Sequence, residues 1–89
     1  MKGEIPPTVG GILEPAVAFG LVLRRLRQEA SLTQEELGFE ADLRRTYVSI
    51  LELGQQQPSL GTILKLSRAL KLPASQVVSL VEAELGNDK

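Results

Sequence analysis

The chain has 89 residues with no cysteine and no histidine, and its ten basic and eleven acidic residues give a formal net charge of −1. This length suits one domain with a single core, and the lack of cysteine excludes disulfides and thiolate metal sites. Histidine, the commonest general base and metal ligand, is also missing, so the composition argues against hydrolytic and redox enzymes. We expect no cofactor and no metal.

The charges are unevenly distributed along the chain. Glu82, Glu84 and Asp88 lie in the predicted last helix and the tail, whereas most basic residues fall between residues 24 and 71: Arg24, Arg25, Arg27, Arg44, Arg45, Lys65, Arg68 and Lys71. One face of the fold can therefore be basic while the rest is acidic. This pattern predicts that any non-specific binding to a polyanion is weak and is more sensitive to salt than the net charge suggests.

Residues 1–14 are interrupted by prolines and glycines and contain no apolar run long enough to span a membrane. We therefore expect no signal peptide and no membrane helix, and a cytoplasmic protein. The breakers favour a flexible or loosely packed arm. The alternative is an arm whose apolar residues cover a groove on this domain or on a partner subunit: Ile5, Val9, Ile12 and Leu13.

A first helix is predicted over residues 15–30, because Pro15 suits the first helical position. Gly20 permits the close approach of a second helix. Apolar residues at helical spacing form the inward stripe and its widened edge: Phe19, Leu21, Val22, Leu23 and Leu26.

Two short helices joined by a tight turn follow. Thr33 and Glu36 have the spacing of a capping box, so a helix begins at Gln34. It lasts about two turns, since the sequence at residues 41–43 interrupts it and Asp42 tolerates left-handed geometry. The next helix is predicted over residues 44–53 and ends at Gly54.

The two sides of the 44–53 helix differ in character. Val48 and Leu51 should be buried against Leu37 and Leu43, whereas the outward side carries Arg45, Thr46, Ser49 and Ile50. Arg44 and Arg45 fall in the first turn, where the helix dipole disfavours each positive charge by roughly 0.3–1 kcal/mol. Such a local cost indicates a functional site, and guanidinium groups suit phosphates and the edge of guanine.

A polar loop, Gln55-Gln56-Gln57-Pro58, separates this helix from two more. It is either a solvated connector or a phosphate contact. Ser59 can cap a helix over residues 60–70, with core residues Ile63, Leu64, Leu66 and Leu70. Pro73 precedes a last helix over residues 74–85, and residues 86–89 form a tail.

The last helix has more apolar residues than one narrow stripe requires. We predict that Val78, Val81 and Leu85 contribute to a dimer interface, with Leu21 and Val22 as further candidates. The alternative is that all of them face the core of the monomer.

Residues 23–72 resemble the helix-turn-helix domain shared by lambda-type phage repressors, Cro and XRE-like bacterial regulators. The resemblance rests on several separated pieces: the Leu-Arg pairs, TQEEL, RTYVS, the Glu-x-Gly ending, PSL and ALKL. It implies an all-α domain of five helices over residues 15–85, with the helix-turn-helix at the second and third helices.

The resemblance also implies roles for individual residues. Arg27 should pair with Glu52 and fasten the first helix to the third. DNA contacts are expected at Gln34, Arg44, Arg45, Thr46, Ser49, Ile50, Gln55, Gln56 and Gln57. Gln34 should also buttress the recognition helix, unless it is an ordinary exposed residue. Ile50 departs from the family, which usually has a polar or basic residue there, so it packs on a thymine methyl, joins Leu53 in a protein contact, or marks weaker base reading.

These expectations describe a dimeric, sequence-specific DNA-binding regulator that reads a palindromic operator with the 44–53 helix in the major groove. It resembles stand-alone repressors and the controller proteins of restriction-modification systems. The alternative is a protein-interaction module or an antitoxin built on the same fold, which would use Ile50, Leu53 and the arm to bind protein.

Overall fold

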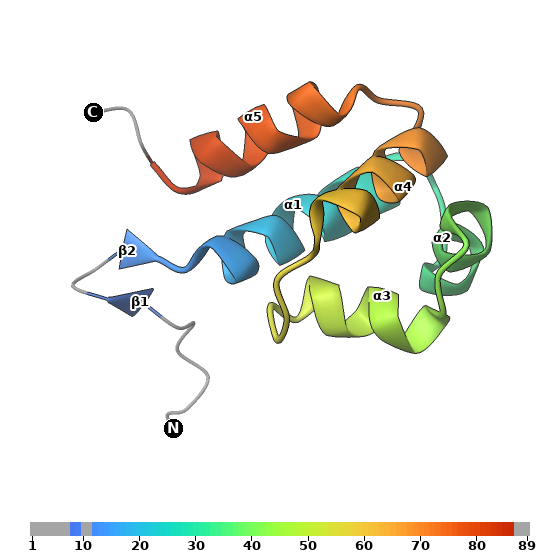
Figure 1. The fold of residues 1–89 in the computed structure, drawn as a ribbon, viewed down its shortest axis with the longest axis horizontal. Coiled ribbons are helices and arrows are strands. Elements are labelled where there is room, and N and C mark those ends of the chain that lie inside the picture. Colours follow the sequence, from blue (N-terminus) through green and yellow to red (C-terminus); the bar gives the residue numbers. More distant parts are fainter. Residues whose placement is uncertain (1–7, 10–11, 87–89) are drawn as a thin grey trace.

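The structure is a computed structural model that describes residues 8–9 and 12–86. Five helices account for most of them: α1 (Pro15–Glu29), α2 (Gln34–Ala41), α3 (Arg45–Glu52), α4 (Leu60–Leu70) and α5 (Ala74–Glu84), preceded by the two-residue strands β1 (Thr8–Val9) and β2 (Ile12–Leu13) (Figure 1). The predicted all-α, five-helix fold is confirmed. No helix in the described part of the chain has the length and apolar character needed to cross a membrane.

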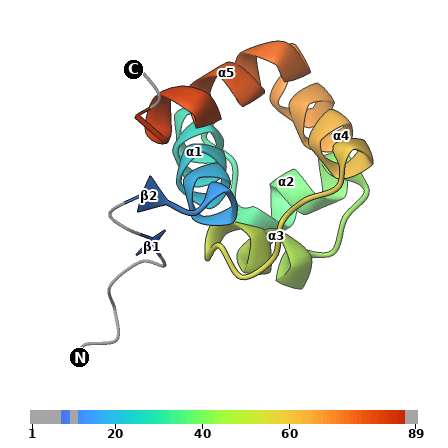
Figure 2. The same cartoon turned by 60° about the vertical axis from the view of Figure 1, so that its left-hand side comes forward.

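The helices enclose one core. α1 contacts both α3 and α5, which lie on opposite sides of it, while α4 packs against α2 and α5 (Figures 1 and 2). Buried side chains from all five helices form a single cluster: Phe19, Val22, Leu23, Leu26, Leu37, Ala41, Val48, Leu51, Leu66, Leu70 and Val77. The α2–α3 unit is thereby fixed on α1 and α4, and its outer side is left uncovered.

Each of the first four helices is followed by a residue in the left-handed conformation. These residues are Ser31, Asp42, Gly54 and Lys71, with φ of 60°, 60°, 74° and 63°. At each of these turns, the next amide donates to a carbonyl of the last helical turn, as from Leu72 to Ser67 at 3.0 Å. The predicted turn at residues 41–43 and the predicted end at Gly54 are confirmed. The helices are slightly shorter than predicted, since α1, α3 and α5 lack one or two terminal residues that serve as caps.

One core residue predicted for α4 lies on the opposite side of the helix. Leu64 is 46% exposed, because the inward stripe of α4 consists of Ile63, Leu66, Ser67 and Leu70. Ser67 joins this stripe because its hydroxyl donates to the Ile63 carbonyl at 2.6 Å. Val22, predicted at the widened edge of the inward stripe of α1, is fully buried in the core, so it is not available for a dimer interface.

The segment predicted to form an arm contains the β1–β2 pair. Its strands run antiparallel, with Thr8 opposite Leu13 and Val9 opposite Ile12. Residues 1–7, 10–11 and 87–89 lie outside the described residues. Ile5, one of the arm residues that the alternative prediction places over a groove, is among them. The described part of the arm leads directly into α1.

Candidate nucleic-acid interface

The start of α2 and the turn into α3 are fixed by short-range contacts. Thr33 and Glu36 form both hydrogen bonds of the predicted capping box, at 2.9 and 3.0 Å. After α2, Leu43 donates its amide to the Gly38 carbonyl at 2.8 Å. A Cβ at Gly38 would lie 2.7 Å from the Leu43 carbonyl oxygen, so only glycine lets the turn fold this tightly against α2.

α3 has one fully buried side and one open end. Val48 and Leu51 are fully buried, as predicted, whereas Arg44, Arg45 and Thr46 at the start of the helix are exposed. Arg44 occupies the cap position without capping through its side chain, and the first turn contains no acidic residue. The positive end of the helix dipole and two guanidinium groups therefore face solvent together.

Ile50 and Ser49 are predicted on the exposed face of the helix, but both are half-buried. After α3 the turn at Gly54 folds the chain back, and the Gln55 amide donates to the Ile50 carbonyl at 3.1 Å. The same bond occupies the backbone N–H of Gln55. The side chains of Gln55, Gln56 and Gln57 remain exposed beside the end of α3.

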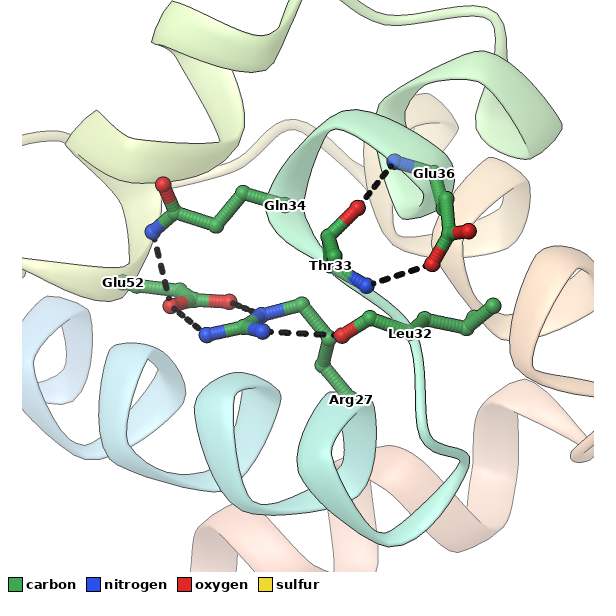
Figure 3. A network of polar contacts seen from close by, with 6 residues as sticks. All are labelled: Arg27, Leu32, Thr33, Gln34, Glu36 and Glu52. Carbon is green, nitrogen blue, oxygen red and sulfur yellow. Dashed lines mark hydrogen bonds and ion pairs between the residues drawn. The ribbon is translucent and has the colours of Figure 1, made fainter.

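A polar network fastens the last residue of α3 to α1 and α2 (Figure 3). Arg27 donates from Nε and Nη2 to the two carboxylate oxygens of Glu52, the second at 3.0 Å, and from Nη1 to the Leu32 carbonyl at 2.9 Å. Gln34 donates from its side-chain amide to Glu52 at 3.0 Å. The hydrogen bond to Glu52 raises the pKa of Arg27 above its ordinary value. The predicted ion pair is thus present, and Gln34 supports the recognition helix through it.

The residues predicted for a dimer interface are only partly open. Val78 is 42% exposed, whereas Val81 and Leu85 are half-buried. Val81 also packs on the core cluster and lines a shallow apolar cleft together with Phe19, Pro58 and Ile63. The stripe therefore divides between the monomer core and the surface.

Two features of α2 were not singled out from the sequence. Phe39 is 83% exposed, and the exposed acids Glu35, Glu36 and Glu40 line the same shallow pocket. Helical spacing could have predicted this, because Phe39 falls opposite Leu37 and Ala41 on the helix. Within residues 8–9 and 12–86, no three acidic side chains lie close enough together to hold a metal ion.

Comparison with known proteins agrees with this geometry. A family model described as helix-turn-helix matches residues 23–77. Control protein C.BamHI of Bacillus amyloliquefaciens is 45% identical over 53 residues, which are 58% of this chain and 65% of that protein, so the chain spans less than two thirds of that relative. Control protein C.MunI of a Mycoplasma species is 38% identical over 69 residues, which are 76% of this chain and 93% of that protein.

A solved structure is similar over a comparable range. It is that of the restriction-modification controller protein C.AhdI from Aeromonas hydrophila, which is 44% identical with a TM-score of 0.68 over 70% of this chain and 94% of that chain. The family match covers more than half of the sequence and includes the whole α2–α3 unit. The chain therefore belongs to the helix-turn-helix family of DNA-binding transcriptional regulators, in its XRE and lambda-repressor-like branch.

Proposed function

We propose that this chain is a homodimeric transcriptional regulator that inserts α3 into the major groove of a palindromic operator. One observation carries the proposal: α3 exposes Arg44, Arg45 and Thr46 at its positive end, while its other side and its last residue are anchored to the core. An anchored helix with an open cationic end presents its side chains to DNA at little cost in conformational entropy. A regulator of this kind acts on bacterial DNA, and hence in the cytoplasm.

The proposed contacts fall into two kinds. Arg45 and Thr46 read base edges, because guanidinium and hydroxyl groups match the pattern of donors and acceptors in the major groove. Phosphate contacts come from the flanking residues Arg44, Gln34 and Ser49 and from the loop side chains Gln55, Gln56 and Gln57. Gln34 keeps one amide hydrogen for a phosphate, since Glu52 accepts only one of the two.

The dimer gives the protein enough base pairs to recognise. Two copies of α3 related by a two-fold axis reach half-sites about 34 Å apart, which predicts a symmetric operator. We assign the interface to Val78, Val81 and Leu85, with Leu21, an exposed apolar residue of α1, as a further candidate. Residues 15–85 then form the DNA-binding and dimerisation domain, with residues 1–14 as an arm and 86–89 as a tail.

A role as a controller or repressor is supported by the relatives, which include two control proteins and the immunity repressor protein of Bacillus phage phi105. In this role the protein acts by occupying its operator or by contacting RNA polymerase. Its occupancy is set by its concentration and by dimerisation.

Selection of bound sites from random duplexes tests the proposal directly. The full-length protein should enrich a symmetric consensus, and gel shifts on that consensus at two salt concentrations should show a specific complex that weakens at the higher salt. Failure to enrich any sequence at either salt concentration rejects the proposal.

A second candidate is a protein-interaction module or antitoxin on the same fold. Leu53, at the end of α3, is 64% exposed, and Phe39 is also open to solvent. Where exposed apolar side chains gather in one patch, they mark a protein contact. In this case the wild-type protein binds DNA without sequence preference, and substitution of Leu53 by serine abolishes capture of the protein partner.

A further inference from the structure

Gly20 lies in the middle of α1, at the point where α1 meets the end of α3. A Cβ at this position would lie 2.5 Å from the Leu51 carbonyl oxygen and 2.6 Å from the Glu52 carbonyl oxygen. Both atoms belong to the backbone, so rotation of a side chain cannot relieve the contact. Gly20 is not among the residues with positive φ, and glycine is a poor residue for a helix interior. Its role here is therefore the close approach.

A similar contact lies at the other end of α3. A Cβ at Gly38 would approach the Leu43 carbonyl oxygen at 2.7 Å and the Arg45 amide nitrogen at 3.4 Å. α3 has eight residues, so it is about 12 Å long. The helix is thus held close to α2 at its start and close to α1 at its end, with the residues expected to read DNA between the two contacts.

We propose that Gly20 is a positioning residue for DNA recognition that sets the angle at which α3 enters the major groove. The proposal rests on the proposed DNA-reading role of α3. A methyl group at position 20 must displace the end of α3 by about half an ångström to remove the overlap. Because the contact at Gly38 holds the start of the helix, α3 pivots there, and Ser49 and Ile50 move further than Arg45.

The test is selection of bound sites with the full-length wild type, Gly20→Ala and the matched control Gly61→Ala. Gly61 lies in α4, and its nearest contact for a Cβ is Ser59 Oγ at 3.8 Å, so a methyl group fits there. For Gly20→Ala we expect an unchanged base at the position that Arg45→Ala relaxes, and a changed base at the position facing Ile50, nearer the displaced end of the helix. Its affinity for the wild-type consensus should fall roughly tenfold, while non-specific affinity and salt dependence stay the same.

Loss of stability must be separated from repositioning. Leu70→Ala removes core volume from α4, so it lowers stability without adding bulk against α3. If Leu70→Ala changes the consensus as Gly20→Ala does, or if folded Gly20→Ala selects the wild-type consensus, the inference is overturned. If Gly20→Ala does not fold alone, it is placed in a Lys71→Gly background. In that case a second variant is also used. Arg27→Lys loosens the same end of α3 without adding bulk, and the inference holds only if this variant alters the operator positions that Gly20→Ala alters.

These outcomes also separate this inference from the proposed function. A wild-type protein that enriches no sequence rejects both. A wild-type protein that enriches a symmetric consensus, together with a Gly20→Ala variant that enriches the same one, rejects only the positioning role of Gly20.

Discussion

Arg27 of α1 and Glu52 of α3 form an ion pair whose side chains are only 12% and 4% exposed. Removing one partner leaves the other charge largely buried and poorly compensated, so Arg27→Ala should lower the free energy of unfolding by about 3–5 kcal/mol. Urea denaturation followed by circular dichroism measures this change. The matched control is Arg25→Ala. Arg25 pairs with Glu84 at 3.3 Å, and the two side chains are 47% and 28% exposed. Exposed ion pairs of this kind contribute about 0–1 kcal/mol to stability.

The contribution of Arg27 to stability should not vary with pH in the ordinary range. The hydrogen bond to Glu52 raises the pKa of Arg27 in the folded state above the ordinary value of an arginine. A raised pKa gives stability that is fully present below the unfolded value and is lost as the pH rises through the folded value. Arg27→Ala should therefore lower the free energy of unfolding more than Arg25→Ala does at every pH from about 6 to 9. Equal losses in the two variants would contradict the assignment of the buried pair.

Lys71 ends α4 in the left-handed conformation, with φ of 63°. This conformation costs a residue with a Cβ about 1–2 kcal/mol, and the greater entropy of glycine in the unfolded chain offsets part of the gain. Lys71→Gly should therefore stabilise the protein by about 0.5–1 kcal/mol, which raises the melting temperature by roughly 2–8 °C.

The control for Lys71→Gly lies on the same helix. Lys65 is exposed in the interior of α4, so Lys65→Gly removes the same charge but should destabilise by about 1 kcal/mol. Calorimetry of the two variants compares them directly. A lower melting temperature for both would show that the left-handed turn carries no strain.

Local sequence signals accounted for most of the fold. The Thr33–Glu36 spacing, the breaker at Asp42 and the glycine at position 54 predicted the bounds of the helix-turn-helix because each acts within a few residues. The errors arose where the inward side of a helix depends on its neighbours. A leucine such as Leu64 is predicted to be buried when the neighbouring helices are unknown. In the structure, α2 and α5 pack against the side of α4 that carries Ser67.

The candidate site was only partly predictable for the same reason. The exposed arginines follow from helical periodicity, and the Arg27–Glu52 pair followed from family resemblance. The hydrogen bond from Gln34 to Glu52 and the half-burial of Ile50 depend on how three separate segments meet in space. No pattern within one segment encodes such contacts. The glycine at position 20 did predict the close approach of another helix, but not that the backbone it meets is the end of α3.

Val78 is the most exposed of the three residues assigned to the dimer interface. A lysine at this position places a charge in the interface, so Val78→Lys should shift the protein from dimer to monomer in sedimentation equilibrium, with an unchanged melting temperature of the monomer. Leu64→Lys serves as the control, because Leu64 is similarly exposed on α4. If only Leu64→Lys dissociates the dimer, the interface lies on α4 and not on α5.

Arg45→Ala should weaken operator binding while it leaves the fold intact or makes it more stable. The loss of a bidentate contact to guanine lowers specific affinity by about 1–3 kcal/mol and relaxes one operator position. The same change removes a positive charge from the first turn of α3, which should stabilise the helix by about 0.3–1 kcal/mol. Gel-shift titration and thermal melting measure the two effects, and their opposite signs cannot arise from unfolding. The control is Arg68→Ala, which removes an exposed charge from α4 and should leave operator affinity unchanged. If both variants lose the same operator affinity, Arg45 contributes only its positive charge and does not read a base.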